Sequence, residues 1–209
     1  MSELINEVLS AILQIVAFGL IPFLFFLFRK DKTITFSNYI GLYMPKELPA
    51  TYIAVAALFF IIAGSGLIYM NDNIKEAVLS PNSVTGKLRS AGLNSTSIMI
   101  LLIVAIFKTS FAEELLFRGF LAKQIISKTN FNKGNIIQAT IFGLLHLLLF
   151  LALTKTTFIP LLLIFILTTC AGWVCGYLNE KQTNGSILPS WIAHAIGNIV
   201  AYFIIAFII

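Results

Sequence analysis

The stretch FAEELLFRGF, residues Phe111–Phe120, places two adjacent carboxylates and an arginine inside an otherwise apolar run. A charged side chain near the centre of a membrane-spanning helix costs about 2.5–3.5 kcal/mol, and such residues usually mark a functional site. The two histidines of the sequence, His146 and His194, also lie in apolar runs. These features predict one buried polar site inside a membrane protein.

The composition excludes an ordinary soluble domain. Of the 209 residues, 58% are hydrophobic and 11% are charged, and the mean hydropathy is +0.94. Soluble domains carry about 25% charged residues, so this chain has too little polar surface to form a soluble globule. Its apolar runs are continuous rather than alternating, which favours helices over a membrane barrel. We therefore expect an all-α, polytopic transmembrane helix bundle with an intramembrane active-site cavity.

About six runs have the length of roughly 20 residues that a membrane helix needs. We predict spans over residues 8–28, 50–70, 95–127, 135–153, 158–178 and 187–209, which together form a single transmembrane domain, residues 1–209. The polar connection at 71–94 contains the helix breakers Pro81, Gly86 and Gly92, and we expect one short amphipathic helix in it, over 74–79.

The loop charges predict the orientation. With the N-terminus outside, seven basic residues fall in inside loops and four in outside loops, which agrees with the positive-inside rule. The inside residues are Arg29, Lys30, Lys32, Lys46, Lys128, Lys133 and Lys181, and the outside residues are Lys75, Lys87, Arg89 and Lys155. The net charge of +5 therefore reflects topology, and without a dense basic run we expect no nucleic-acid partner.

The two glutamates are predicted to have different roles. Glu114 and Arg118 are four residues apart and share a helix face, so they can form an ion pair. Glu113 is rotated by about 100° from Glu114. It is left without this partner and is a candidate general base. The alternative is a structural charge network that holds helices together.

The histidines are predicted to face the same cavity. Phe142 lies four residues before His146, and Asn198 lies four residues after His194, so each pair shares a helix face. An imidazole and an amide can both donate hydrogen bonds to an oxyanion. The alternative is polar contacts between helices. The depths of these residues favour one cavity in the inner or middle membrane, opening toward the cytoplasm.

Nucleophilic chemistry is poorly supported by the sequence. Ser110 and Ser190 lack the glycine-flanked turn of a nucleophilic serine. Cys170 and Cys175 are about 140° apart on a helix, so neither a disulfide nor a shared metal is expected. We interpret both cysteines as small apolar side chains.

Three ordered motifs resemble the CPBP family, the CAAX-protease and bacteriocin-processing group also called Abi proteins. They are Glu113-Glu114-x-x-x-Arg118, Phe142-x-x-x-His146 and His194-x-x-x-Asn198, within a core of residues 108–200. The group includes type II prenyl-protein endopeptidases. The resemblance implies that Glu113 and His146 activate a water, that His194 and Asn198 stabilise the oxyanion, and that Glu114 and Arg118 support the site.

The resemblance leaves two mechanisms open. Members were first called metalloproteases, and Glu113, His146 and His194 would be a possible His₂Glu zinc set. A metal-free, glutamate-dependent mechanism is the one later favoured for the family, and we expect no required cofactor. The sequence lacks a His-Glu-x-x-His motif.

We therefore expect an intramembrane endopeptidase of the bacterial cytoplasmic membrane. Its partners would be the lipid bilayer and a membrane-associated peptide or small membrane-protein substrate. Two other functions stay open: a non-catalytic bacteriocin self-immunity or binding protein on the same scaffold, and a small transporter, because transporters also use buried carboxylates and histidines.

Overall fold

The computed structural model describes residues 2–29, 33–69 and 71–209. Within these ranges the regular structure is entirely helical, and six helices are long and apolar enough to cross a membrane. The spans are Ser2–Leu27, Ala50–Tyr69, Ser95–Lys128, Phe131–Leu153, Phe158–Gln182 and Leu188–Phe207. The predicted all-α, multi-pass architecture is confirmed, with small shifts at the span ends.

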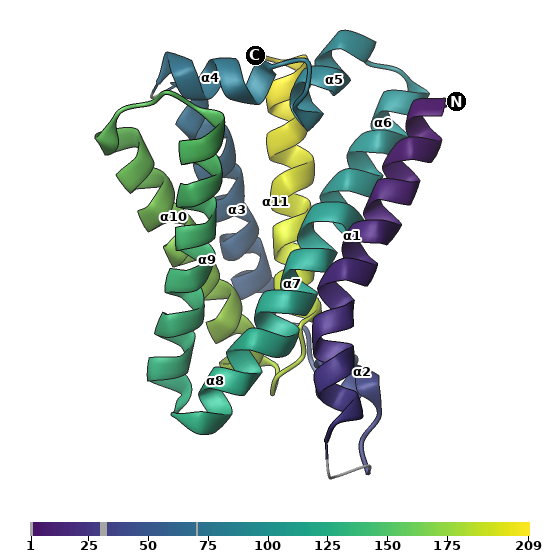
Figure 1. The fold of residues 1–209 in the computed structure, drawn as a ribbon, viewed down its shortest axis with the longest axis vertical. Coiled ribbons are helices and arrows are strands. Elements are labelled where there is room, and N and C mark those ends of the chain that lie inside the picture. The colour runs from purple at the N-terminus through teal and green to yellow at the C-terminus, as the bar shows by residue number, and fades with distance from the viewer. Residues whose placement is uncertain (1, 30–32, 70) are drawn as a thin grey trace.

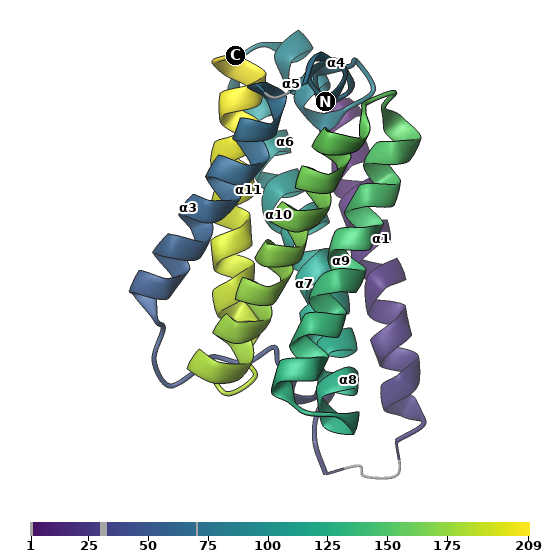
Figure 2. The same cartoon turned by 90° about the vertical axis from the view of Figure 1, so that its left-hand side faces the viewer.

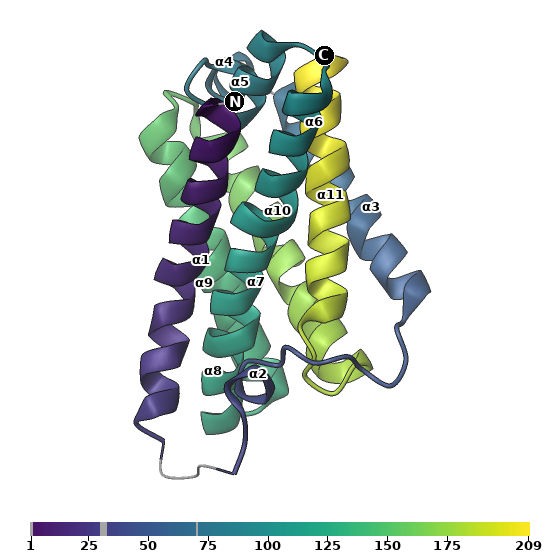
Figure 3. The same ribbon diagram turned by 90° about the vertical axis from the view of Figure 1, so that its right-hand side faces the viewer.

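The two ends of the bundle differ. Both chain termini lie at one end with the short helices α4 (Asp72–Leu79) and α5 (Val84–Ala91), and we call this the terminal end (Figure 1). The opposite end holds α2 (Phe36–Tyr39) and the turn over residues 183–187 (Figure 3). The site is best located by its distance from these two ends.

The third span is a single bent rod that carries the charged stretch. It comprises α6 (Ser95–Leu102), η2 (Ile103–Phe111), α7 (Ala112–Leu116), η3 (Phe117–Ala122) and α8 (Lys123–Lys128). Its 34 residues would extend for about 51 Å, well beyond a hydrocarbon core of about 30 Å. Asn94 and Ser97 form a capping box that starts it. The segments η2 and η3 are π-helical, so α7 lies between two local changes of helical winding.

Of the first two spans, only the first packs along this rod. Helix α1 (Ser2–Leu27) lies along η2 and α7, and most of its surface is exposed and apolar, as expected beside lipid. Helix α3 (Ala50–Gly66), which ends in the 3₁₀ turn η1 (Leu67–Tyr69), packs along α11 (Leu188–Phe207) instead (Figure 3). Lys108 on the rod pairs with Glu7 of α1 at 2.8 Å.

Helices α9 (Phe131–Leu153) and α10 (Phe158–Tyr177) form a close antiparallel pair (Figure 2). A Cβ added to Gly143 of α9 would lie 2.0 Å from Thr169 Oγ1, so the absence of a side chain permits this approach. Gln138 Nε2 donates to Gly172 O at 2.8 Å, and Asn135 Nδ2 donates to Trp173 O at 3.0 Å. These buried amides fix the register of the pair.

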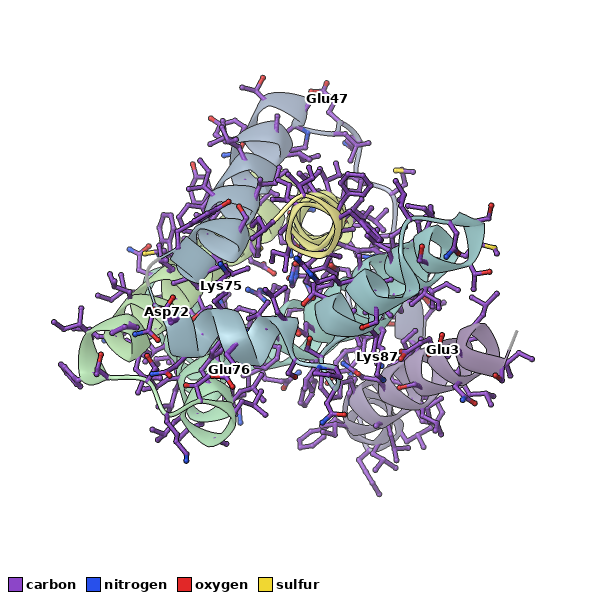
Figure 4. All side chains as sticks on the ribbon, turned by 90° about the horizontal axis from the view of Figure 1, so that it is seen from above. Glu3, Glu47, Asp72, Lys75, Glu76 and Lys87 are labelled. Carbon is purple, nitrogen blue, oxygen red and sulfur yellow. The ribbon has the colours of Figure 1, made fainter. Side chains whose placement is uncertain are left out.

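The 71–94 connection contains two helices, whereas the sequence predicted one. Helix α4 matches the predicted amphipathic segment, but α5 runs through Gly86, which was interpreted as a helix breaker. A Cβ on Gly86 would lie 1.9 Å from Ser80 O, so this glycine serves a close helix contact rather than a break. Figure 4 shows α4 crossing the terminal end, with Asp72, Lys75 and Glu76 along it.

At the opposite end the first interhelical loop is tied to the loop before α11. Ile187 N donates to Gly41 O at 2.9 Å, and Tyr43 Oη donates to Asn184 O at 2.5 Å. Burial, followed by the nearby Glu180 carboxylate, raises the pKa of Tyr43 above its ordinary value, so this phenol stays a neutral donor. Lys123 Nζ joins the cluster by donating to Gly185 O at 2.6 Å. These contacts hold the two loops together at the opposite end.

Candidate active site

A buried ion pair lies at the centre of the rod. Glu114 is fully buried, Arg118 is 1% exposed, and Arg118 Nη1 lies 3.1 Å from Glu114 Oε1. The predicted pairing is therefore present. The guanidinium also lies over the ring of Phe142 of α9, 4.3 Å from its centroid. The pair thus links the rod to α9 while neutralising two charges that would be very costly alone.

Glu114 also contacts α11 through both of its oxygens. His194 Nδ1 lies 3.2 Å from Oε1, and Ser190 Oγ donates to Oε2 at 2.5 Å. Because the carboxylate beside Arg118 is an acceptor, it orients the imidazole with Nδ1 as the donor and Nε2 facing away. Glu114 therefore determines the orientation of His194.

Glu113 lies on the other side of His194. Its Oε2 is 3.9 Å from His194 Nε2, too far for a direct hydrogen bond. This oxygen is buried and has no hydrogen-bond partner within the described ranges. Of the two glutamates, Glu113 is thus the one with free acceptor capacity, as the sequence predicted.

His146 projects from α9 toward the same region. Its Nδ1 is 2.9 Å from the carbonyl oxygen of Phe142, and because a carbonyl can only accept, Nδ1 must be the donor. In the neutral ring Nε2 then carries the lone pair. The local helix geometry therefore gives His146 the tautomer that a general base needs.

Asn198 follows His194 by one turn of α11. Its Nδ2 donates to Ser110 Oγ at 3.1 Å, and Ser110 in turn donates to Ala105 O at 2.7 Å. An amide nitrogen has two hydrogens, so one remains for a ligand. Ser110 is fully buried at the end of η2, and its hydroxyl reaches the carbonyl of Ala105, five residues earlier in this π-helical segment.

His146, His194 and Asn198 line one chamber of about 380 Å³. Its walls come from α3, α9, α10 and α11, and its lining extends to residues of α4 and α5 at the terminal end. Most of the lining is apolar, and none of its members is Asp, Glu, Lys or Arg. Large apolar contributors are Phe60, Leu67, Leu149, Phe150, Leu167 and Tyr202. Glu113 is not among the lining residues, but its Oε2 lies 3.9 Å from Nε2 of His194, which is.

The chamber bears on two predictions made from the sequence. The N-terminus was expected outside, and the site was expected to open toward the cytoplasm. The chamber's lining includes residues of α4 and α5, which lie at the end of the bundle that holds both termini (Figure 1), and none of the described loop residues at the opposite end. If substrate enters from the end that the chamber reaches, a site that opens toward the cytoplasm requires the N-terminus inside. The two predictions are then incompatible.

The residues suggested for zinc do not form a metal-ligand set. Among the described residues, no three His, Cys, Asp or Glu side chains are grouped closely enough to hold a metal ion. His146 and His194 each use Nδ1 within the protein, which leaves only their Nε2 atoms as ligands. Glu113, His146 and His194 thus do not form the possible His₂Glu zinc set in this arrangement. Both cysteines are free thiols, as expected.

Four residues of the site were not assigned there from the sequence. Phe60 of α3 stacks on His194, Ser190 and Asn179 bind each other beside Glu114, and Ser110 binds Asn198. Ser190 and Ser110 were considered as nucleophiles, and neither was assigned a supporting role in the site. Ser190 lies four residues before His194, which puts the two side chains on the same helix face. The sequence could therefore have indicated that Ser190 belongs to the site.

A set of apolar spanning helices around buried carboxylates, imidazoles and an amide defines a polytopic membrane protein with an intramembrane polar site. A family model described as "Type II CAAX prenyl endopeptidase Rce1-like" matches residues 95–200, about half of the chain, so the chain belongs to the Rce1-like family. The predicted family is thereby confirmed, and the scaffold is that of a CAAX-type intramembrane protease. No curated protein and no solved structure matches the chain.

Proposed function

We propose that this protein is an intramembrane endopeptidase that hydrolyses peptide bonds of a membrane-associated peptide or protein. The observation that carries the proposal is the grouping of His146, His194 and Asn198 around one chamber, with Glu113 3.9 Å from His194. Membership of a family of endopeptidases supports the same reaction class. The four residues come from three different spans, so the grouping is a property of the fold.

Water activation falls to Glu113 and His146 in this proposal. Glu113 Oε2 is buried and unpaired within the described part of the chain, so it can accept a proton from water. His146 presents Nε2 as an acceptor because Nδ1 is held by the Phe142 carbonyl. The water oxygen attacks the peptide carbonyl carbon while its proton passes to this pair. The same proton is then available to the departing amine.

Oxyanion stabilisation falls to His194 and Asn198. Asn198 retains one amide hydrogen beyond its bond to Ser110. His194 faces the site with Nε2, because its Nδ1 is held by Glu114 Oε1 at 3.2 Å, and it donates from Nε2 in its doubly protonated form. Removing one oxyanion donor from a hydrolase typically lowers kcat by about 10²–10³-fold.

The chamber favours an uncharged, apolar substrate segment. Its lining provides no carboxylate or ammonium partner for a charged side chain, and a buried unpaired charge is costly. Suitable substrates would be remnants of leader or signal peptides, or precursors of bacteriocins or pheromones. We place the protein in the cytoplasmic membrane of a bacterial cell, with the bilayer supplying these substrates.

Reconstituted protein tests this function. Liposomes containing the wild type would be given apolar peptides with a fluorophore and a quencher at their ends, and products would be identified by mass spectrometry. We expect internal cleavage, and a lysine placed within the apolar segment should suppress it. Absence of cleavage across a library of apolar peptides would contradict the proposal and favour a binding or immunity role.

A further inference from the structure

Two buried residues outside the four proposed catalytic groups are connected to them. Asn179 lies in η4 (Leu178–Gln182), the last part of the fifth span, and Ser190 lies in the first turn of α11. They are 1% and 0% exposed. They are 11 residues apart in the sequence, on either side of the turn over residues 183–187.

Asn179 holds Ser190 through two hydrogen bonds. Its Nδ2 donates to Ser190 Oγ at 2.7 Å, and its Oδ1 accepts from Ser190 N at 3.3 Å. The second bond satisfies one of the backbone N–H groups that every helix start leaves without an intrahelical partner. Asn179 thus fixes both the start of α11 and the position of the Ser190 hydroxyl.

The direction of the hydroxyl proton follows from these contacts. Because Ser190 Oγ accepts from Asn179, its own hydrogen is free to be donated to an acceptor. Glu114 Oε2 lies at 2.5 Å and the Ile187 carbonyl oxygen at 3.1 Å, so the carboxylate is the nearer acceptor. Arg118 and His194 meet the other oxygen of the same carboxylate.

We propose that Asn179 and Ser190 are positioning residues that act through Glu114. They hold its carboxylate in the orientation that keeps His194 Nδ1 protonated and directs Nε2 toward Glu113 and the chamber. The expected effect on kcat rests on the proposed function. The expected orientation and tautomer of His194 do not. Neither residue is among those that line the chamber, so substrate binding does not depend on them directly.

Loss of the Ser190 hydroxyl leaves Glu114 Oε2 without this donor. The carboxylate is then held only through Oε1, by Arg118 and His194. It can shift about its terminal torsion, so that it holds the Nδ1 proton of His194 less firmly. Because Ser190 contacts neither substrate nor the reacting atoms, the consequence should appear in kcat rather than in KM.

The kinetic experiment compares Ser190→Ala, Asn179→Ala and the double variant in liposomes. We expect each single change to lower kcat about tenfold or more with KM unchanged, a loss in line with a hydrogen bond to a charged group. The double variant should be no slower than Ser190→Ala, because Asn179 acts through Ser190. Ser190→Thr, which keeps the hydroxyl, should recover part of the rate.

Ser97→Ala is the matched control. Ser97 is also a buried serine whose hydroxyl donates to a backbone carbonyl, but it caps the start of the rod far from Glu114. It should lower thermal stability and leave kcat unchanged. Equal effects of Ser97→Ala and Ser190→Ala on kcat, or additive effects of the Ser190 and Asn179 changes, would overturn the proposal.

The tautomer of His194 provides a second test, which does not require the protein to cleave a peptide. The chain contains two histidines, so protein labelled with ¹⁵N in its imidazoles gives two sets of ring signals, and His146→Gln assigns them. In the neutral ring of wild-type His194 we expect the proton on Nδ1, and in Ser190→Ala a mixture with the Nε2 tautomer. An unchanged His194 tautomer in Ser190→Ala would refute the positioning role even if the wild type cleaves no peptide.

Discussion

Phe60 of α3 stacks on the imidazole of His194, with ring centroids 4.6 Å apart and planes inclined by 12°. Gly197 of α11 permits this approach, because a Cβ there would lie 2.3 Å from Phe60 Cβ. The matched family region begins at residue 95, so α3 lies outside it and still supplies one face of the proposed oxyanion donor. The site therefore depends on a helix outside the matched family region as well as on that region.

Replacing Phe60 tests this dependence. Phe60→Leu keeps an apolar side chain but removes the stacked ring, and we expect kcat to fall about threefold to tenfold, in line with an aromatic contact of about 0.5–1.5 kcal/mol. Peptide cleavage by reconstituted protein provides the measurement. Phe158→Leu, at a ring that is 74% exposed, should be silent. Full activity of Phe60→Leu would show that the stacking is dispensable.

The Glu114–Arg118 pair makes a prediction about stability. Arg118→Met would leave a fully buried carboxylate without its cation, which typically costs about 3–5 kcal/mol. The midpoint of thermal unfolding in detergent should drop sharply, and Arg118→Lys should recover little, because an ammonium cannot reproduce the planar guanidinium over Phe142. Adding Glu114→Gln to Arg118→Met should restore much of the stability. A single Arg118→Met variant as stable as the wild type would contradict the structural role of the pair.

Thiol labelling decides between the two incompatible predictions on access. In a Cys170→Ser background, Asn82→Cys reports on the terminal end and Ser127→Cys on the opposite end; both positions are exposed. If the basic loops set the orientation, a membrane-impermeant maleimide added to intact cells labels Asn82→Cys and leaves Ser127→Cys unlabelled. The chamber then extends toward the outer face. The reverse pattern would place the N-terminus inside and the chamber toward the cytoplasm.

Metal removal addresses the cofactor question. We expect cleavage to persist after treatment with a chelator, and purified protein to contain zinc at well below one ion per chain, because Glu113, His146 and His194 are not grouped as ligands. Metal analysis and a cleavage assay on the same sample provide both numbers. Activity lost on chelation and restored by added zinc would establish a metal-dependent enzyme and a different arrangement of these side chains.

The membrane helices could be predicted from sequence because lipid leaves few alternatives. A continuous apolar run of about 20 residues must satisfy its backbone internally, so hydropathy alone located all six spans. The same signal is absent from short polar helices. Helix α5 was missed because its stability comes from packing on α11 and α6 and from the close contact of Gly86 with Ser80, neither of which has a hydropathy pattern.

Part of the site could also be predicted, because some of its contacts are local in the sequence. The i,i+4 spacing of Glu114 and Arg118 is local, so the pair followed from helical geometry. The contacts of His194 with Glu114, Phe60 and Glu113 join segments 80 or more residues apart, and spacing cannot give them. Motif order indicated which residues belong together, while only the packed bundle shows which atoms face each other.

Substitution of Glu113 is the most direct test of the proposed hydrolysis. Glu113→Gln keeps the size of the side chain and removes the base, so cleavage of an apolar peptide by reconstituted protein should fall by about 10²-fold or more, with the protein still folded. Glu47→Gln, at an exposed position remote from the chamber, is the control and should cleave at the wild-type rate. Wild-type turnover by Glu113→Gln would contradict the assignment of Glu113 as the group that activates water.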